Sequence, residues 1–230
     1  MIKYLNALLW KEFKLIKQNV VSKFISQLSI NIILIAILIL RVKISKLPMN
    51  IDTIINITTY VLIITGYISF ISNLKFWQEK SFKTIESLLA TPIPIYIVVI
   101  SKILAPIIFS IIVILINYSI YEVFFALFFK YNIFRISSLL IAIALSSFFD
   151  YCYGIITAYS MWCASIGVAK ILQYLSIGIY LSSIFSIFFV PSNINLLNSN
   201  IKYAFILLVI VSFYCFIFIN KEKCITSLQD

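Results

Sequence analysis

The chain has 230 residues, of which 63% are hydrophobic and 11% are charged, and its mean hydropathy is +1.09. Soluble domains are about a quarter charged, so this composition excludes a soluble globular protein and indicates an integral membrane protein. The net charge of +10 would suggest a nucleic-acid partner in a soluble protein. Here the lysines stand mainly at the ends of apolar segments, where anchoring at a membrane surface explains them. We therefore expect no nucleic acid as a partner.

Residue types needed for catalysis or cofactor binding are scarce. Histidine is absent, which excludes a histidine-ligated metal and a histidine general base. The four glycines are too scattered for a phosphate-binding loop, and no hydrolase motif occurs. Cys152, Cys163 and Cys215 fall in or beside apolar segments without CxxC spacing, so we interpret them as small buried hydrophobic residues. We expect no enzyme activity, catalytic residue, metal or cofactor in this chain.

The chain begins with an amphipathic segment, residues 1–22, that we expect to form a helix along the membrane surface. Leu5, Leu8 and Ile16 follow helical spacing, and lysines occupy most of the remaining turns. An apolar stripe beside lysines is typical of a helix that lies on the cytoplasmic leaflet. The alternative is that this segment is simply the solvated start of the first membrane span.

Six apolar segments follow that are long enough to cross a bilayer core of about 30 Å as helices. They are too long and unbroken for barrel strands, so we predict an all-α fold with six transmembrane helices, forming a single transmembrane domain over residues 1–230. The predicted spans are about 24–40, 54–74, 95–117, 136–159, 171–190 and 203–219. Residues 118–135 are ambiguous, and we interpret them as an extension of the third span or a segment that dips into the outer face. Residues 193–200 are predicted to be a polar connector.

A charged stretch, residues 78–90, separates the second and third spans. Its charged residues are Glu79, Lys80, Lys83 and Glu86. As a helix it would gather an apolar face from Phe82, Ile85, Leu88 and Leu89. A short amphipathic helix between two spans is expected to lie on the membrane surface and present its charged face to a soluble partner. The alternative is a plain connecting loop.

The distribution of basic residues predicts the orientation of the chain in the membrane. Six spans place both termini on one side, which then carries 12 of the 18 lysines and arginines. Because basic residues are enriched on the cytoplasmic side, we expect both termini in the cytoplasm and the protein in the plasma membrane. The stretch 78–90 then also faces the cytoplasm.

Asp150 is predicted to lie near the middle of the fourth span. A carboxylate at that depth is unfavourable unless it is protonated, paired or turned toward a bundle interior. Two interpretations follow. Asp150 is either a coupling or substrate-path residue, or a polar staple, that is, a side chain whose hydrogen bonds hold neighbouring helices together. We favour the staple. The hydroxyl groups considered as its partners belong to Tyr118, Ser110 and Ser160.

Lys102 stands early in the third span. Its long side chain can reach back to the inner membrane surface, which is the more frequent behaviour of such a lysine. It is also within reach of the stretch 78–90, with Glu86 or Glu79 as the expected partner.

A sequence pattern runs from the charged stretch into the third span. It consists of Glu79, Thr84-Ile85-Glu86, Leu88-Leu89-Ala90-Thr91-Pro92-Ile93 and Ser101-Lys102. This pattern resembles the signature of ABC-2 type transporter permeases. Residues 7–14 are similar to the amphipathic connecting helix of that family, and residues 188–191 to the end of its fifth span. The chain departs from the family at Lys83, where the family usually has glycine.

The resemblance implies a permease subunit of an ATP-binding cassette exporter. In that family a half-transporter with six spans pairs with a second copy, as a homodimer or heterodimer. It docks a separately encoded ATPase subunit, which binds ATP and Mg²⁺ and drives export from the cytoplasm. The docking residues that the resemblance implies are Glu79, Lys80, Lys83, Thr84 and Glu86.

Two other interpretations stay open. The membrane subunit of the haem exporter of cytochrome c maturation has a similar length and a P-x-P motif before the lysine, which Pro92-Ile93-Pro94 matches. An ion-coupled carrier or a membrane scaffold without an ATPase would instead make Asp150 essential and residues 78–90 dispensable.

Overall fold

The computed structural model describes residues 2–18, 25, 51–82, 84–130, 134–165, 167–172, 174, 178 and 194–227. Within these residues the fold is helical and has no strand. Three predicted features lie outside them: the first span (24–40) except residue 25, most of the fifth span (171–190), and Lys83. The helices are α1 (Ile2–Gln18), α3 (Ile51–Asn73), α4 (Phe76–Ser81), α5 (Thr84–Leu89), α6 (Ile95–Phe129), α7 (Ile136–Trp162), α9 (Ile194–Phe218) and α10 (Lys221–Thr226).

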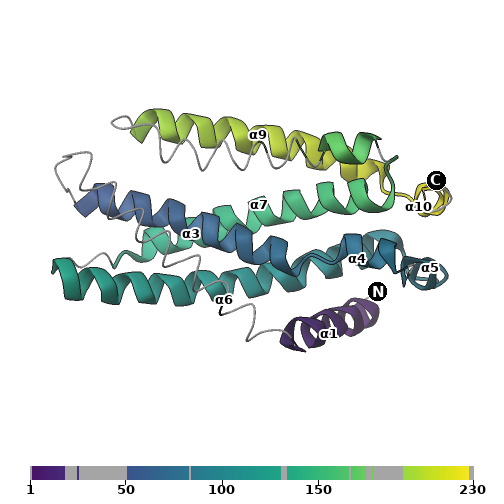
Figure 1. Ribbon diagram of the computed structural model, residues 1–230, viewed down its shortest axis with the longest axis horizontal. Coiled ribbons are helices and arrows are strands. Elements are labelled where there is room, and N and C mark those ends of the chain that lie inside the picture. Colours follow the sequence, from purple (N-terminus) through teal and green to yellow (C-terminus); the bar gives the residue numbers. More distant parts are fainter. Residues whose placement is uncertain are drawn as a thin grey trace.

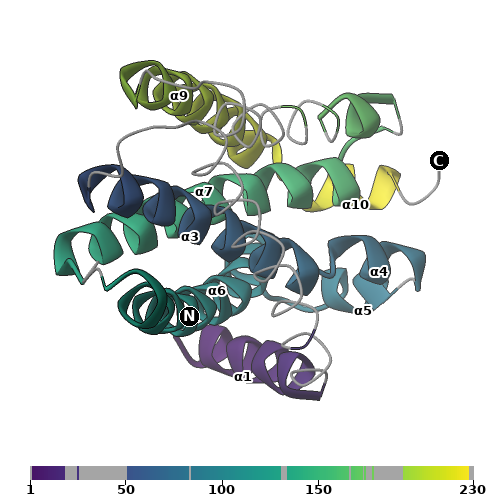
Figure 2. The ribbon, with the colours of Figure 1, turned by 60° about the vertical axis from the view of Figure 1, so that its left-hand side comes forward.

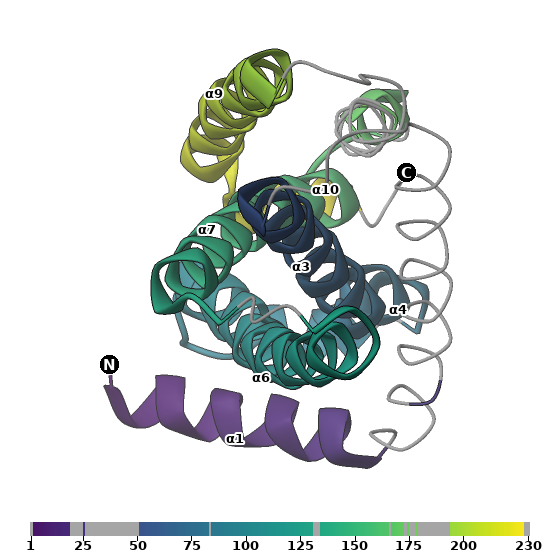
Figure 3. The same ribbon diagram turned by 90° about the vertical axis from the view of Figure 1, so that its left-hand side faces the viewer.

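Helices α3, α6 and α7 pack against one another and form the core of the described fold (Figures 1 and 3). They contain 23, 35 and 27 residues, which at 1.5 Å per residue is about 34, 52 and 40 Å. Among the described residues, these three helices are the ones long and apolar enough to cross a membrane. The fold is therefore that of an all-helical chain compatible with a membrane protein, with three candidate spans.

Two of the predicted bounds differ from the structure. Helix α6 does not end near residue 117 but continues to Phe129, so the interpretation of 118–135 as an extension of the third span is confirmed up to that residue. It ends at Lys130, whose φ of 56° is left-handed. Helix α9 begins at Ile194, so the polar connector predicted over 193–200 is wrong. The sequence keeps apolar residues at helical spacing there, at positions 194, 197 and 201.

Two glycines allow the three core helices to approach closely. A Cβ atom on Gly66 of α3 would meet Ser146 Oγ and would lie 2.7 Å from Ile114 Cδ1, and one on Gly154 of α7 would lie 2.8 Å from Ile103 Cγ1. Small residues at helix contacts are the usual means by which helices pack in membranes, where no hydrophobic force drives them together.

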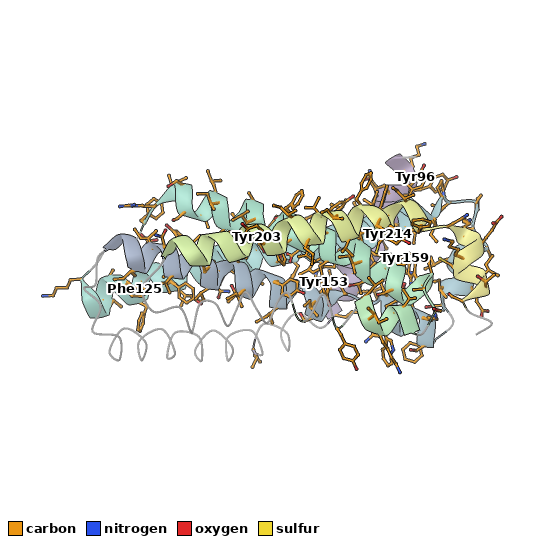
Figure 4. All side chains as sticks on the ribbon, turned by 90° about the horizontal axis from the view of Figure 1, so that it is seen from above. Tyr96, Phe125, Tyr153, Tyr159, Tyr203 and Tyr214 are labelled. Atoms are coloured by element: carbon orange, nitrogen blue, oxygen red, sulfur yellow. The ribbon has the colours of Figure 1, made fainter. Side chains whose placement is uncertain are left out.

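Two helices flank the core. Helix α1 lies across α6 near one end of the bundle, and α9 packs along α7 on another side (Figures 2 and 3). Figure 4 shows Tyr153 and Tyr159 on α7 close to α9, and Tyr203 and Tyr214 along α9 itself. The outer face of α9 is apolar and exposed, as expected of a surface that meets lipid.

The short helices α4, α5 and α10 gather at one end of the bundle, where α1 also lies (Figure 1). We call this the α4/α5 end. Tyr96, at the start of α6, lies near it, whereas Phe125 lies toward the opposite end (Figure 4). The first and last helices of the chain thus share one end with the charged stretch between α3 and α6.

Candidate functional site

The charged stretch 78–90 is not the single helix that its spacing predicts but two short helices, α4 and α5, separated at Phe82. The hydroxyl of Thr84 donates to the carbonyl of Glu79 across the break, at 3.3 Å. The predicted apolar face forms in part, because Leu88 and Leu89 of α5 pack against the same core cluster as Ile85. Ile85 is buried, whereas Phe82 is 75% exposed.

The start of α4 is fixed to the end of α7. Phe76 is buried and meets Trp162 edge to face, with ring centroids 5.0 Å apart. The indole Nε1 of Trp162 also donates to the Phe76 carbonyl, at 3.2 Å. A buried aromatic pair with its polar atom satisfied is a specific contact, so α4 is held in one orientation.

The end of α5 is held by the C-terminal helix. Lys221, the first residue of α10, donates from Nζ to the carbonyls of Leu89 at 3.2 Å and Thr91 at 2.7 Å. The last carbonyls of a helix have no partner within the helix, and a lysine near them also interacts favourably with the helix dipole. Helix α10 therefore caps α5.

A buried ion cluster lies behind the two short helices. Lys102, near the start of α6, is 6% exposed, and its Nζ lies 2.8 Å from Glu12 Oε1. The same Nζ forms a second ion pair with Glu79. Buried charges are tolerated when they are paired, so this lysine binds α1, α4 and α6 to one another. The predicted contact of Lys102 with Glu79 is confirmed, whereas Glu86 is exposed on α5.

The sequence interpretation missed Glu12 as a partner of Lys102. The signal was its position, because Glu12 lies four residues from both Leu8 and Ile16 and thus falls on the apolar side of α1. The side chain is indeed buried. An acid on the apolar stripe of an amphipathic helix indicates a basic partner on another element.

Asp150 is fully buried where α7 meets α6. Ser110 of α6 donates to its Oδ2 at 2.8 Å, and Ser146, one turn earlier on α7, donates to the same atom at 3.5 Å. The predicted partner Ser110 is therefore confirmed. Tyr118 and Ser160 were wrongly predicted as partners. The Tyr118 hydroxyl donates to the Arg135 carbonyl, and the Ser160 hydroxyl donates to the Thr157 carbonyl. Within the described part of the chain, Oδ1 of Asp150 has no hydrogen-bond partner.

Comparisons with protein-family models, curated proteins and solved structures found no match. In the described ranges, no three His, Cys, Asp or Glu side chains lie together in a way that could hold a metal ion.

The surface of the α4/α5 end differs from the docking residues that the sequence implies. Glu79 is largely buried on Lys102, Lys80 is half-buried, and Lys83 lies outside the described residues. Thr84 and Glu86 are exposed. Two aromatic side chains that the sequence interpretation did not select are also exposed at this end, Trp77 by 64% and Phe82 by 75%.

Proposed function

We propose that this chain is the membrane-spanning permease subunit of an ATP-binding cassette exporter. It lies in the plasma membrane with α1 and α10 in the cytoplasm, and it pairs with a second permease copy. A separately encoded ATPase subunit, carrying ATP and Mg²⁺, docks on the α4/α5 end and drives export of a substrate from the cytoplasm.

The observation that carries this proposal is the contrast between the two sides of α4 and α5. On the inner side, Glu79 of α4 is paired with Lys102 and Ile85 of α5 is buried. On the outer side, Trp77, Phe82 and Glu86 are exposed. A docking element must offer residues to a partner and must also transmit the movement of that partner. Exposed aromatic side chains are the residue type most enriched in protein interfaces.

The contacts behind the α4/α5 end supply routes for that movement. Phe76 and Trp162 join α4 to α7, and Lys102 joins α4 to α6 and α1. Two of these partners, α6 and α7, are candidate membrane spans. Close-packed elements move as rigid bodies, so a displacement of the α4/α5 end would be passed to the candidate spans α6 and α7.

The charge distribution supports the proposed orientation. The four lysines of α1, which are Lys3, Lys11, Lys14 and Lys17, are all exposed, and α1 lies at the α4/α5 end. Exposed lysines beside a span favour the cytoplasmic leaflet, where anionic lipids attract them.

The surroundings of Asp150 are consistent with the structural role that the proposal gives it. Two serine hydroxyls donate to this carboxylate from the two helices that it joins. The hydrogen bond from Ser110 joins α6 to α7, and a permease driven by an ATPase needs no further role for this residue.

Co-purification from native membranes tests the proposal. We expect a tagged wild-type chain, extracted in mild detergent, to bring down a protein with a phosphate-loop ATPase domain. The double change Trp77→Ala and Phe82→Ala should lower the recovered ATPase at least tenfold, because it removes the exposed anchors and leaves the buried contacts intact. The matched control is Phe134→Ala, which removes an exposed aromatic side chain beside the start of α7, at the opposite end. Equal recovery of the ATPase with wild type and with the double variant would contradict docking at this end.

A further inference from the structure

Two cysteines from distant parts of the sequence meet at the α4/α5 end. Cys163 directly follows α7, Cys224 lies in α10, and their sulfur atoms are 2.6 Å apart. This separation is about half an ångström longer than a disulfide bond. The chain's other two cysteines, Cys152 and Cys215, are also buried and unbonded, but they are placed within α7 and α9.

The surroundings hold the two thiols in this position. The Cys163 thiol also donates to the Asn220 carbonyl at 3.9 Å, and the hydroxyl of Ser227 donates to the Trp162 carbonyl. These contacts come from both sides of Cys224 and join α10 to the end of α7. The two sulfur atoms are therefore held close together before any covalent bond forms.

The two thiols differ in ways that suit stepwise chemistry. A hydrogen bond from Cys224 lowers the pKa of Cys163 and outweighs burial, which raises it; the nearby charges of Lys223 and Lys80 also lower it. The thiolate is the nucleophile in thiol–disulfide exchange. Cys163 is 8% exposed and Cys224 is fully buried, so Cys163 is the residue of the pair that retains some contact with solvent.

We propose that Cys163 and Cys224 form a reversible disulfide that joins the end of α7 to α10. The Cys163 thiolate attacks a low-molecular-weight disulfide, R–S–S–R, forming Cys163–S–S–R and releasing one thiolate, RS⁻. The Cys224 thiol then loses its proton and attacks the Cys163 sulfur, which forms the protein disulfide and releases the second RS⁻. The two cysteines lose two electrons and two protons, and the reagent leaves as two molecules of RSH.

The bond would act on the proposed docking end. Lys221, which caps α5, lies in the same helix as Cys224, and Trp162, which holds α4, directly precedes Cys163. A covalent link between these positions fixes both short helices relative to α7. This consequence rests on the proposed function, whereas formation of the disulfide does not. In the reducing cytoplasm such a bond forms only under oxidation, which is the behaviour of a redox-sensing pair.

Counting free thiols in the full-length chain tests the proposal without any ATPase. The purified protein in detergent is treated with oxidised glutathione, denatured, and labelled with a maleimide polymer that adds a fixed mass per thiol. We expect the number of labels to fall from the four cysteines of the sequence to two, and to return to four with dithiothreitol. Digestion should yield one linked species in which the Cys163 and Cys224 peptides are joined with loss of two hydrogen atoms.

The variants locate the bond. Cys152→Ser and Cys215→Ser should each still lose two labels on oxidation, whereas Cys163→Ser and Cys224→Ser should give no internal disulfide. The peptide map of the wild-type chain decides the matter even if a serine variant does not fold. Retention of all four labels, a bond between other cysteines, or glutathione left on Cys163 without transfer to Cys224 would each overturn the proposal.

Discussion

Lys102 is buried together with Glu12 and Glu79, so its charge has two roles in the described structure. It neutralises the carboxylates, and it joins α1 to α4 through a residue of α6. Removing one member of a buried ion cluster leaves the others uncompensated, which is far more costly than replacing the whole cluster by neutral residues.

We therefore predict that Lys102→Met destabilises the protein by about 3–5 kcal/mol. Thermal unfolding of the purified variant in detergent measures the effect as a fall in Tm. The triple change that adds Glu12→Gln and Glu79→Gln should recover most of the loss, because no buried charge is then left without a partner. Lys3→Met is the matched control, since Lys3 is exposed on α1. An unchanged Tm for Lys102→Met would show that the cluster does not hold these helices together.

The two partners of Lys102 differ in how far they could be predicted from the sequence. Glu79 precedes the lysine by 23 positions, at the opposite end of one short connection, and that contact was predictable. Glu12 lies 90 positions away and meets the lysine only because α1 docks on α6. No local pattern encodes this docking, although the place of an acid on the apolar stripe signals that a partner exists.

At the scale of elements, tertiary contacts override local spacing between α3 and α6. The spacing predicts one helix over residues 78–90, yet the chain forms α4 and α5, and Phe82 between them is exposed. Phe76 packs against Trp162 and fixes the start of α4, whereas Lys221 fixes the end of α5. Each short helix is therefore positioned by a different contact. The partners in these contacts are 86 and 132 positions apart in the sequence, so the local sequence pattern does not predict that two helices form.

The end of α6 illustrates the same limit. The sequence predicts that the span ends near Asn117, where polar residues begin. In the structure Asn117 and Tyr118 are both buried inside the helix. The Tyr118 hydroxyl accepts a hydrogen bond from the Arg135 backbone N–H at 2.8 Å, which satisfies it against the loop before α7. A polar residue ends a predicted span only when it has no partner within the fold.

The packing of α3 against α6 and α7 makes a prediction for Gly66. Gly66→Ala would place a methyl group 2.7 Å from Ile114 Cδ1 and against Ser146, which donates to Asp150. We expect a net destabilisation of about 1–3 kcal/mol from overpacking, seen as a lower Tm in detergent.

Gly167→Ala is the matched control for this packing effect. Gly167 is also helical, but a Cβ there meets nothing within 4 Å. Alanine is the better helix former by up to about 1 kcal/mol, so this variant should be neutral or slightly stabilised. Equal effects of the two changes would mean that close approach at Gly66 does not govern how α3 packs.

At the scale of the whole molecule, the composition was sufficient to predict an all-helical chain compatible with a membrane. Hydropathy reports how apolar each segment is, but it does not specify which helices are neighbours. The packing of α3, α6 and α7 into one core depends on the close approach that Gly66 and Gly154 allow, and the position of α1 across α6 depends on the ion pair of Lys102 with Glu12. The sequence therefore predicted the class of the fold, and the structure showed how the helices behind the α4/α5 end are arranged.

The central claim is that the α4/α5 end faces the cytoplasm, where an ATPase can reach it. Labelling with a membrane-impermeant maleimide tests it most directly, with Glu86→Cys at this end and Phe134→Cys at the other. The wild-type chain serves as the blank, and any label that its own cysteines take up, Cys163 above all, is subtracted. The proposal predicts that Glu86→Cys is labelled in inverted membrane vesicles and not in intact cells, and that Phe134→Cys shows the reverse. Labelling of Glu86→Cys in intact cells would contradict the proposed function.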